Sequence, residues 1–375
     1  MPDPGFKAGL EDVVAGLSDI CFIDGKEGRL VYRGYNAVEL AEKASFEEVV
    51  YLLWNGKLPT RAELAELDRE LKANRTLAEP VQSALNSLPP STLPMDALRT
   101  AVSVAGIYDP DAHANDMEAN RRKAVRLVAQ IPTMVTHFER VRQGKAPVAP
   151  DPNLSLAENF LYMLHGERPR PSHASVFNTA LILHADHELN ASTFSARVTA
   201  ATLSDMYSAI TSAVGTLKGP LHGGANEQVM YMLQEIGSKE NVKPWLERAF
   251  AEKRKIMGFG HRVYKTEDPR ATVLRRLSRQ LGEEANDLRY WEMLREIETT
   301  ITASKKLYPN VDFYSGSAYV LMGIPIEIFT PVFAVSRISG WTAHVLEQYA
   351  HNRLIRPRAE YTGPTHLDFV PLDQR

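Results

Sequence analysis

The sequence predicts an almost entirely helical protein with a small β-hairpin near its N-terminus. Capping boxes at Ser45 and Thr60 each open an amphipathic run, and the segments that follow keep helical patterns. Short β-prone runs lie near the beginning of the chain, in residues 20–23 and 30–32 on either side of a glycine-containing turn. With 375 residues the chain is long enough for a large core and more than one domain. The predicted class is therefore all-α, with two domains.

Further helices are expected in order along the chain. They cover residues 154–164, 173–184, 242–255, 269–281 and 288–307, and a long helix runs from Thr193 to Ala213 and stops at Gly215. Residues 144–153 are rich in proline and polar side chains, which predicts an exposed loop. Glycines and prolines interrupt the chain again at 215–224, and the helices after this point are more charged. Apolar character returns from residue 318, so the charged block is interpreted as a smaller domain inserted into a larger one.

Composition limits the possible partners and location. The formal net charge is -3, hydrophobic residues make up 44% and charged residues 24%, which is ordinary for a globular protein and does not favour nucleic acid or an anionic membrane as partner. The single cysteine, Cys21, cannot form an intrachain disulfide, which fits a reducing compartment. The N-terminus lacks the features of a secretion signal, and no apolar run reaches the ~20 residues that span a bilayer. We therefore expect a cytoplasmic protein.

The first candidate for chemistry is His222, in the glycine-rich segment 217–226. Glycines on both sides of a histidine allow backbone to approach a ligand closely. A helix is expected to start near Asn226, and the free N–H groups at its start disfavour a charged imidazolium. A neutral imidazole can donate a hydrogen bond to a developing enolate. His222 is therefore predicted to be functional.

The second candidate is His261, which follows Gly258-Phe259-Gly260. This segment imitates the start of a dinucleotide-binding fingerprint, but no third glycine follows and no strand precedes it, so that interpretation is rejected. We interpret the segment as a glycine-loosened loop that carries the histidine. Arg270 comes directly after Pro269, a residue suited to the first turn of a helix, so its guanidinium is expected to reach a cleft.

The third candidate is Asp312, an acidic residue among Val311, Phe313 and Tyr314. One possibility is that it only caps a helix N-terminus. The other is a general base whose pKa is raised by its apolar neighbours. His184 and His187, three residues apart, also allow a zinc site, although no second pair of ligands is evident and the single cysteine does not supply one.

Taken together, these segments resemble the citrate synthase family over nearly the full length of the chain. The motifs that carry the resemblance are HADHE at 184–188, GPLHGGAN at 219–226, GFGHRVY with DPR at 258–270, PNVDFYSG at 309–316, VSR at 335–337 and RPR at 356–358. The resemblance implies a helical homodimer. Its large domain would comprise residues 1–219 and 323–375 and carry the oxaloacetate site. Its small domain, residues 220–322, would bind CoA and close over the site.

The resemblance also implies the activity and the residue roles. The enzyme would be an acyltransferase of the tricarboxylic acid cycle that condenses acetyl-CoA with oxaloacetate and water to give citrate and CoA. Asp312 would remove a methyl proton from acetyl-CoA, His222 would hold the enolate, and His261 would polarise the oxaloacetate carbonyl. The remaining assignments are His187, Arg270, Phe333 and Arg337 around oxaloacetate or citrate, Arg356 from the partner subunit, and Gly258, Gly260, Lys265 and Lys305 at CoA.

No cofactor or metal is expected, because acetyl-CoA is a substrate and the reaction is not a redox reaction. The short segment before the hairpin leaves no room for the N-terminal domain of family members regulated by NADH, so a dimer is expected rather than a hexamer. The principal alternative is a 2-methylcitrate synthase, which would use propionyl-CoA at the same residues. A zinc-dependent hydrolase that uses His184 and His187 is a more remote alternative, and a non-catalytic helical scaffold is another.

Overall fold

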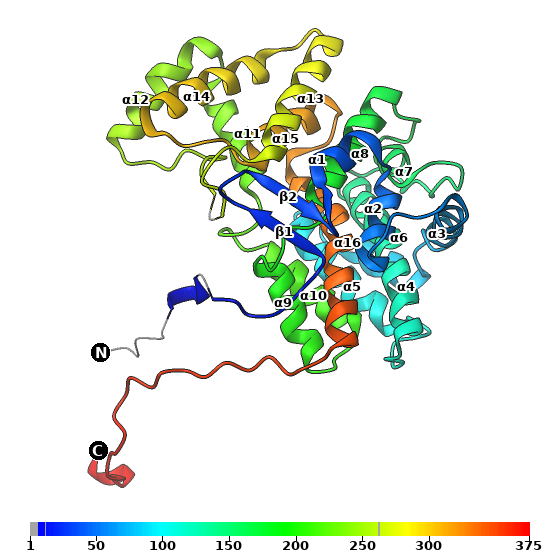
Figure 1. The fold of residues 1–375 in the computed structure, drawn as a ribbon, viewed down its shortest axis with the longest axis vertical. Coiled ribbons are helices and arrows are strands. Elements are labelled where there is room, and N and C mark those ends of the chain that lie inside the picture. The colour runs from blue at the N-terminus through cyan, green and yellow to red at the C-terminus, as the bar shows by residue number, and fades with distance from the viewer. Residues whose placement is uncertain (1–6, 12, 262) are drawn as a thin grey trace.

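A computed structural model of the protein describes residues 7–11, 13–261 and 263–375. Within these residues it contains sixteen α-helices and one small antiparallel sheet, which confirms the predicted all-α class and the hairpin (Figure 1). The strands are β1 (Cys21–Asp24), β2 (Arg29–Tyr32) and β3 (Tyr35–Asn36), in the order β1-β2-β3. Cys21 pairs with Tyr32 and Asp24 pairs with Arg29.

The helices follow the hairpin in an unbroken series. Those that precede the glycine-rich segment 219–224 are α1 (Ala37–Lys43), α2 (Phe46–Asn55), α3 (Arg61–Ala73), α4 (Glu79–Ser87), α5 (Pro94–Ile107), α6 (Met117–Arg142), α7 (Leu156–His165), α8 (Pro171–His184), α9 (Ala191–Ala201) and α10 (Met206–Leu217). Those that follow it are α11 (Ala225–Ile236), α12 (Val242–Ala251), α13 (Pro269–Ala285), α14 (Arg289–Lys305), α15 (Val311–Leu321) and α16 (Phe329–Ala350).

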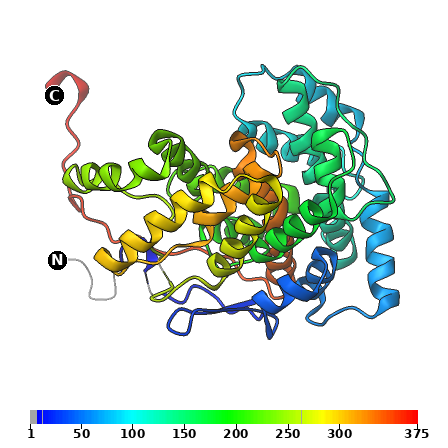
Figure 2. The ribbon, with the colours of Figure 1, turned by 90° about the horizontal axis from the view of Figure 1, so that it is seen from above.

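The helices form two groups. In Figure 1 helices α11 to α15 lie together at the upper left, and Figure 2 shows α12 and α14 on the side opposite the cyan helices of the first half of the chain. Helix α16 runs through the larger group, where it packs on α6, α9 and α10, and Trp341 and Arg337 on it are fully buried. A long, buried final helix therefore joins the elements of the larger group.

The caps that the sequence predicts are present. Ser45 and Thr60 both form complete capping boxes with the glutamate three residues later. The prediction of one long helix from Thr193 to Ala213 is wrong, because the chain turns at residues 202–205 between α9 and α10. Leu203 adopts a φ of +64° there, and the Asp205 side chain accepts a hydrogen bond from the Ser208 N–H group and starts a new helix. The predicted stop at Gly215 is also wrong, since α10 continues to Leu217.

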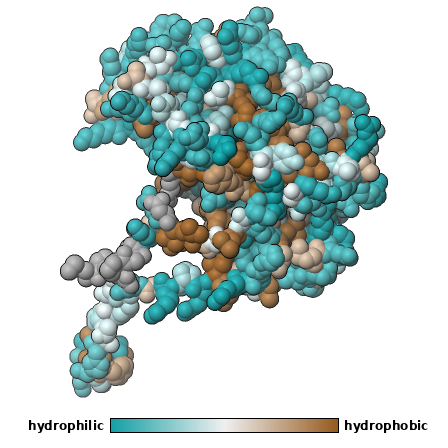
Figure 3. All heavy atoms as spheres, viewed as in Figure 1, coloured by the Kyte–Doolittle hydropathy of each residue, from teal (hydrophilic) through white to brown (hydrophobic). Residues whose placement is uncertain are grey.

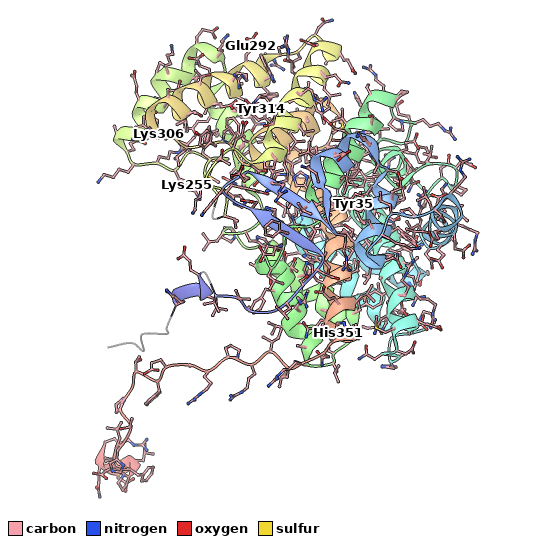
Figure 4. The ribbon with its side chains drawn as sticks, in the orientation of Figure 1. Tyr35, Lys255, Glu292, Lys306, Tyr314 and His351 are labelled. Atoms are coloured by element: carbon pink, nitrogen blue, oxygen red, sulfur yellow. The ribbon has the colours of Figure 1, made fainter. Side chains whose placement is uncertain are left out.

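After α16 the chain leaves the body of the molecule. Figure 4 labels His351 at the end of α16, and from this point the chain leads away as an extended segment that ends in a short 3-10 helix, Leu372–Gln374. The segment exposes large hydrophobic side chains, namely Leu354, Tyr361, Leu367, Phe369, Val370 and Leu372. Figure 3 shows its far end standing clear of the rest of the surface. Within the part of the chain that the structure describes, no helix combines the length and hydrophobicity needed to cross a membrane.

Candidate active site

A cavity of about 130 Å³ gathers most of the predicted site residues. Seven of them line it: His187, His222, His261, Arg270, Asp312, Phe333 and Arg337. The remaining lining residues are Gly223, Gly224, Asn226, Val311 and Thr330. Motifs that lie far apart in the sequence therefore meet at one small, polar site.

Asp312 stands in the first turn of α15. The helix is capped by Asn310, whose side chain accepts the Asp312 N–H group at 3.1 Å, so the alternative that Asp312 is itself the cap is wrong. Burial raises the pKa of the Asp312 carboxyl to about 6, while the Arg270 guanidinium opposes the rise. A carboxyl with this pKa is largely ionised at pH 7 and is still more basic than an ordinary aspartate, as a general base requires.

His222 is held by the first turn of α9. Its Nε2 accepts the backbone N–H group of Ser192 at 3.2 Å, and the Ser192 Oγ lies 2.8 Å from the same nitrogen. The Trp341 indole in turn donates to this Oγ at 3.1 Å. Because a backbone N–H can only donate, Nε2 must be unprotonated, and the proton of the neutral ring is on Nδ1.

The neutral state of His222 also agrees with its surroundings. Burial lowers the pKa of the His222 imidazole to about 4, and the Arg337 guanidinium lowers it further. The sequence predicted a neutral ring from the start of α11, but the N–H group that contacts the ring comes from the start of α9. The expected effect is thus present with a different helix as its source.

His261 has the opposite tautomer. Its Nδ1 accepts the backbone N–H groups of Val263 at 3.0 Å and of Tyr264 at 3.1 Å, which leaves the proton of the neutral ring on Nε2. Burial lowers the pKa of the His261 imidazole to about 4, with Arg270 as the next cause. The ring packs against His187 with centroids 5.1 Å apart.

His187 adds a third neutral ring. Burial lowers the pKa of its imidazole well below the ordinary value, and the neighbouring Arg270 contributes in the same direction. Its Nε2 is buried and has no hydrogen-bond partner among the described residues. An unsatisfied buried nitrogen beside a cavity is costly unless a ligand supplies the missing bond. His187 is therefore well placed to bind a polar group in the cavity.

The two arginines bring positive charge to the cavity. Arg270 forms a bidentate pair with Asp268, with Nε to Oδ1 at 2.9 Å and Nη2 to Oδ2 at 2.8 Å. Arg337 donates from Nε to the His184 carbonyl oxygen at 2.8 Å, and its guanidinium lies 4.5 Å from the centre of the Phe333 ring. Both side chains are almost completely buried. Buried guanidinium groups are suited to binding carboxylates.

Asp268 belongs to the DPR motif, and no role of its own was predicted for it from the sequence. It caps α13 through the Arg270 N–H group at 3.0 Å, and its Oδ2 accepts the Val311 N–H group at 3.1 Å at the start of α15. A single carboxylate therefore fixes both Arg270 and the helix that carries Asp312. An aspartate directly before a proline at the first helical position is a capping signal, which could have revealed part of this role.

Gly258 and Gly260 tie the His261 loop to the Asp312 helix and do not line the cavity. The Asn310 N–H group donates to Gly258 O at 2.9 Å, and the Gly260 N–H group donates to Tyr308 O at 3.1 Å. Gly258 has a φ of +81°, and a Cβ there would lie 2.6 Å from an atom of the Phe313 ring. Gly260 has a φ of +79°, so both positions favour glycine for structural reasons, and their contact with CoA stays a prediction.

Three basic residues from the sequence analysis lie outside the cavity. Lys265 lies on the His261 loop and Lys305 at the end of α14, where its Nζ is 5.0 Å from the centre of the Phe250 ring. Arg356 is exposed on the C-terminal segment. Their assignments to CoA and to the partner's active site stay predictions. Arg262, which belongs to the GFGHRVY motif, lies outside the described residues.

The histidines proposed for a zinc site have other surroundings. The Nδ1 atom of His184 lies 2.7 Å from the Ala180 carbonyl oxygen, to which it must donate. No group of three or more His, Cys, Asp or Glu side chains in the described part of the chain is arranged to hold a metal ion. The zinc-hydrolase alternative gains no support from this geometry.

Comparison with known proteins gives a consistent result. The family described as "Citrate synthase, C-terminal domain" matches residues 9–358. The chain is 53% identical over 368 residues to citrate synthase 2 of Bacillus subtilis, covering 98% of both proteins. It is also 45% identical over 360 residues to the 2-methylcitrate synthase of Mycobacterium tuberculosis, covering 96% of this chain and 91% of the relative.

A solved structure agrees with these relatives. The citrate synthase of Thermoplasma acidophilum, solved in a ternary complex with carboxymethyl coenzyme A and oxaloacetate, superposes with a TM-score of 0.93 at 36% identity. The alignment covers 98% of this chain and 99% of that one. The likeness thus extends over both groups of helices and is not limited to the motifs.

The site geometry predicts the protonation of two rings at pH 7. Both His222 and His261 should be neutral, with the proton on Nδ1 in His222 and on Nε2 in His261, because backbone N–H groups occupy the other nitrogen. Nitrogen-15 NMR of histidine-labelled protein reports the tautomer and the pKa of each ring, with alanine variants for assignment. Titration of either ring above pH 6 would contradict the assignment.

Proposed function

The chain belongs to the citrate synthase family, and from this premise we propose that it condenses acetyl-CoA with oxaloacetate and water to give citrate and CoA. It is an acyltransferase in which the acyl group becomes an alkyl group on transfer. The observation that carries the proposal is the meeting of a raised-pKa carboxyl, neutral imidazoles and two buried guanidinium groups around one small cavity. This set matches a reaction that makes a carbanion equivalent and adds it to a dianionic keto acid.

The first step is enolisation of the acetyl group. Asp312 takes a proton from the methyl carbon, and the Nδ1–H group of His222 donates a hydrogen bond to the thioester oxygen. A thioester is a weak carbon acid, so the base and the oxygen stabiliser must act together. Ser192 keeps the His222 ring in the donating tautomer by occupying Nε2.

The second step forms the carbon–carbon bond. The Nε2–H group of His261 donates to the ketone oxygen of oxaloacetate and stabilises the alkoxide that develops when the enol attacks. Arg270, Arg337 and His187 hold the carboxylates in place, with Phe333 as an apolar wall. The alkoxide takes up one proton, which balances the proton that Asp312 removed. Water then cleaves the citryl thioester, giving its hydroxyl to the acyl carbon and a proton to the CoA sulfur. The histidine N–H groups stabilise the developing oxygen charge and no electrons are exchanged with a carrier, so the proposed reaction requires neither a metal nor a redox cofactor.

We further propose that residues 1–219 and 323–375 form one domain and residues 220–322 a second one that closes over the substrates. Both joints contain glycine with positive φ, at Gly224 and at Gly323. The cavity takes Arg337 from the first part and Asp312 from the second, so a relative movement would open and complete it. Closure would keep water from the thioester until oxaloacetate is bound. Lys265 and Lys305 would then meet the CoA phosphates.

A homodimer with a shared active site is also proposed. Arg356 lies on an extended segment with exposed hydrophobic side chains, which a lone chain in water does not favour. A second copy of the chain would cover these side chains and receive Arg356 at its own cavity. We propose that the enzyme acts in the cytoplasm, within the tricarboxylic acid cycle.

The substrate preference tests the function directly. Acetyl-CoA should give the higher kcat/KM, by about 10-fold or more, because one additional methylene changes binding by ~1–3 kcal/mol. The measurement is CoA release with oxaloacetate and either acetyl-CoA or propionyl-CoA. A higher kcat/KM for propionyl-CoA would make the protein a 2-methylcitrate synthase, and release from neither would refute the proposal.

Removing the base should stop enolisation. Asp312→Asn should lower kcat by at least about 10²-fold, because the amide cannot accept the methyl proton. Oxaloacetate should still bind in calorimetry, since Arg270 and Arg337 are untouched. Asp287→Asn, the same change in the loop between α13 and α14, is the matched control and should behave as wild type. Near-normal turnover in pure Asp312→Asn protein would rule out this base.

The shared site predicts complementation between inactive variants. Asp312→Asn and Arg356→Leu should each be inactive alone. Refolding them together should restore about a quarter of wild-type activity, because about half of the dimers are hybrids and each hybrid has one intact site. The readout is CoA release per total amount of refolded protein.

Subunit exchange needs its own control. Each variant is refolded with differently tagged wild-type protein, and hybrids are captured through both tags. If hybrids form but activity is not restored, Asp312 and Arg356 act from the same chain and the shared-site arrangement is wrong.

A further inference from the structure

The turn of the β1–β2 hairpin lies directly against the loop that carries His261. The Lys265 N–H group donates to the Gly25 carbonyl oxygen at 2.8 Å. Gly25 approaches Val263 so closely that a Cβ would clash with the Val263 carbonyl oxygen and lie 3.0 Å from its carbonyl carbon. A Cβ on Gly28 would lie 2.9 Å from the Glu267 carbonyl oxygen. Figure 1 shows the hairpin turn reaching the base of the group formed by α11 to α15.

The other end of the same hairpin is anchored beside His187. The Tyr32 hydroxyl is fully buried and lies 3.1 Å from both the Ile182 and the Asp186 carbonyl oxygens, which share its single proton. Ile182 lies near the end of α8, and Asp186 directly precedes His187. The antiparallel ladder between β1 and β2 connects this anchor to the turn. One hydrogen-bonded ribbon therefore spans the segments that carry His187 and His261.

The contact is made by the peptide groups that orient the His261 ring. His261 Nδ1 accepts the N–H groups of Val263 and Tyr264. Gly25 contacts the Val263 carbonyl group, and its own carbonyl oxygen accepts the N–H group of Lys265. Any displacement of the hairpin turn therefore shifts the two N–H donors that fix the ring and its tautomer. A displacement of this kind acts on the ring without touching a substrate.

We propose that the β1–β2 hairpin is a positioning element for catalysis, which sets the orientation of His261 through the contact of Gly25 with Val263 and Lys265. The proposal rests on the function given above, in which His261 polarises the oxaloacetate carbonyl. It assigns to the N-terminal strands a role in the chemistry and not only in packing. It also gives a reason why glycine stands at position 25, where φ is not positive and conformational freedom is not required.

The test is Gly25→Ala. Its methyl group must displace the Val263 backbone, and misplacement of a catalytic group by ~1 Å can cost about 10²-fold in rate. We expect kcat to fall about tenfold or more, with little change in KM for acetyl-CoA. The infrared carbonyl stretch of bound ¹³C-labelled oxaloacetate should move toward its value in free solution. A contact that served stability alone would lower the unfolding temperature and leave this stretch unchanged.

Two control variants separate the effect of the Gly25 contact from the effect of an added methyl group or of another change in the turn. Gly16→Ala adds the same methyl group where no atom lies within 4 Å, and Lys26→Ala changes an exposed side chain in the same turn. Both should keep the wild-type kcat and carbonyl stretch. Tyr32→Phe releases the other end of the hairpin while its ring keeps its place in the core, and should shift the stretch in the same direction as Gly25→Ala.

The outcomes are distinguishable. Folded Gly25→Ala protein with wild-type kcat and wild-type carbonyl stretch would overturn the proposal, and if this variant does not fold, Tyr32→Phe decides by the same two measurements. If wild-type protein releases no CoA from acetyl-CoA and oxaloacetate, the proposed function fails instead. The histidine ¹⁵N spectrum still tests the hairpin in that case, because Gly25→Ala must perturb His261 and leave His222 unchanged if the positioning role holds.

Discussion

The buried carboxylate of Asp268 is the interaction on which the site depends. It pairs with the Arg270 guanidinium, caps α13 and accepts the first N–H group of α15, so it fixes Arg270 and the helix that carries Asp312 together. Such a pair adds little net stability compared with apolar packing, but removing one partner costs about 3–5 kcal/mol because the other charge stays buried. Arg337 donates from Nε to a carbonyl oxygen and lies over the Phe333 ring, and burial lowers the pKa of its guanidinium. An anionic ligand beside Arg337 would compensate for the burial of its charge.

Burial acts in opposite directions on the pKa values of the imidazoles and of the carboxyl, and both shifts suit the proposed chemistry. Burial disfavours charge, so it lowers the pKa of the His222 and His261 imidazoles to about 4 and raises that of the Asp312 carboxyl to about 6. The imidazoles are then neutral donors over the physiological range, while the carboxyl is a stronger base than a solvated one. Below pH 6 Asp312 becomes protonated before either ring does, so loss of the base precedes any change in the donors.

The sequence predicted the residues that line the cavity better than the residues that hold those side chains in place. His222, His261 and Asp312 stand in short motifs with glycine or aromatic neighbours, and this local signal was sufficient. Ser192 contacts His222, which lies 30 residues further along the chain, and Tyr32 contacts Asp186, which lies 154 residues further along. No local pattern marks partners that lie so far apart in the sequence. The turn between α9 and α10 was missed for a different reason. Small residues continue through it, and only the capping pair Asp205 and Ser208 indicates a new helix.

The cavity lies where several helices begin. Four residues that line the cavity lie in the first turn of a helix: Asn226 in α11, Arg270 in α13, Asp312 in α15 and Thr330 in α16. The first turn of α9 contacts His222. The N-terminus of a helix carries partial positive charge and unpaired N–H groups. Convergent N-termini and two arginines would favour a dianionic substrate and the negative charge that develops on the enolate and alkoxide oxygens. They also disfavour imidazolium, so the field that binds the anion helps to keep the histidines in the donating form. Burial and this positive field therefore act in the same direction on the histidines, whereas on Asp312 burial raises the pKa and Arg270 opposes the rise.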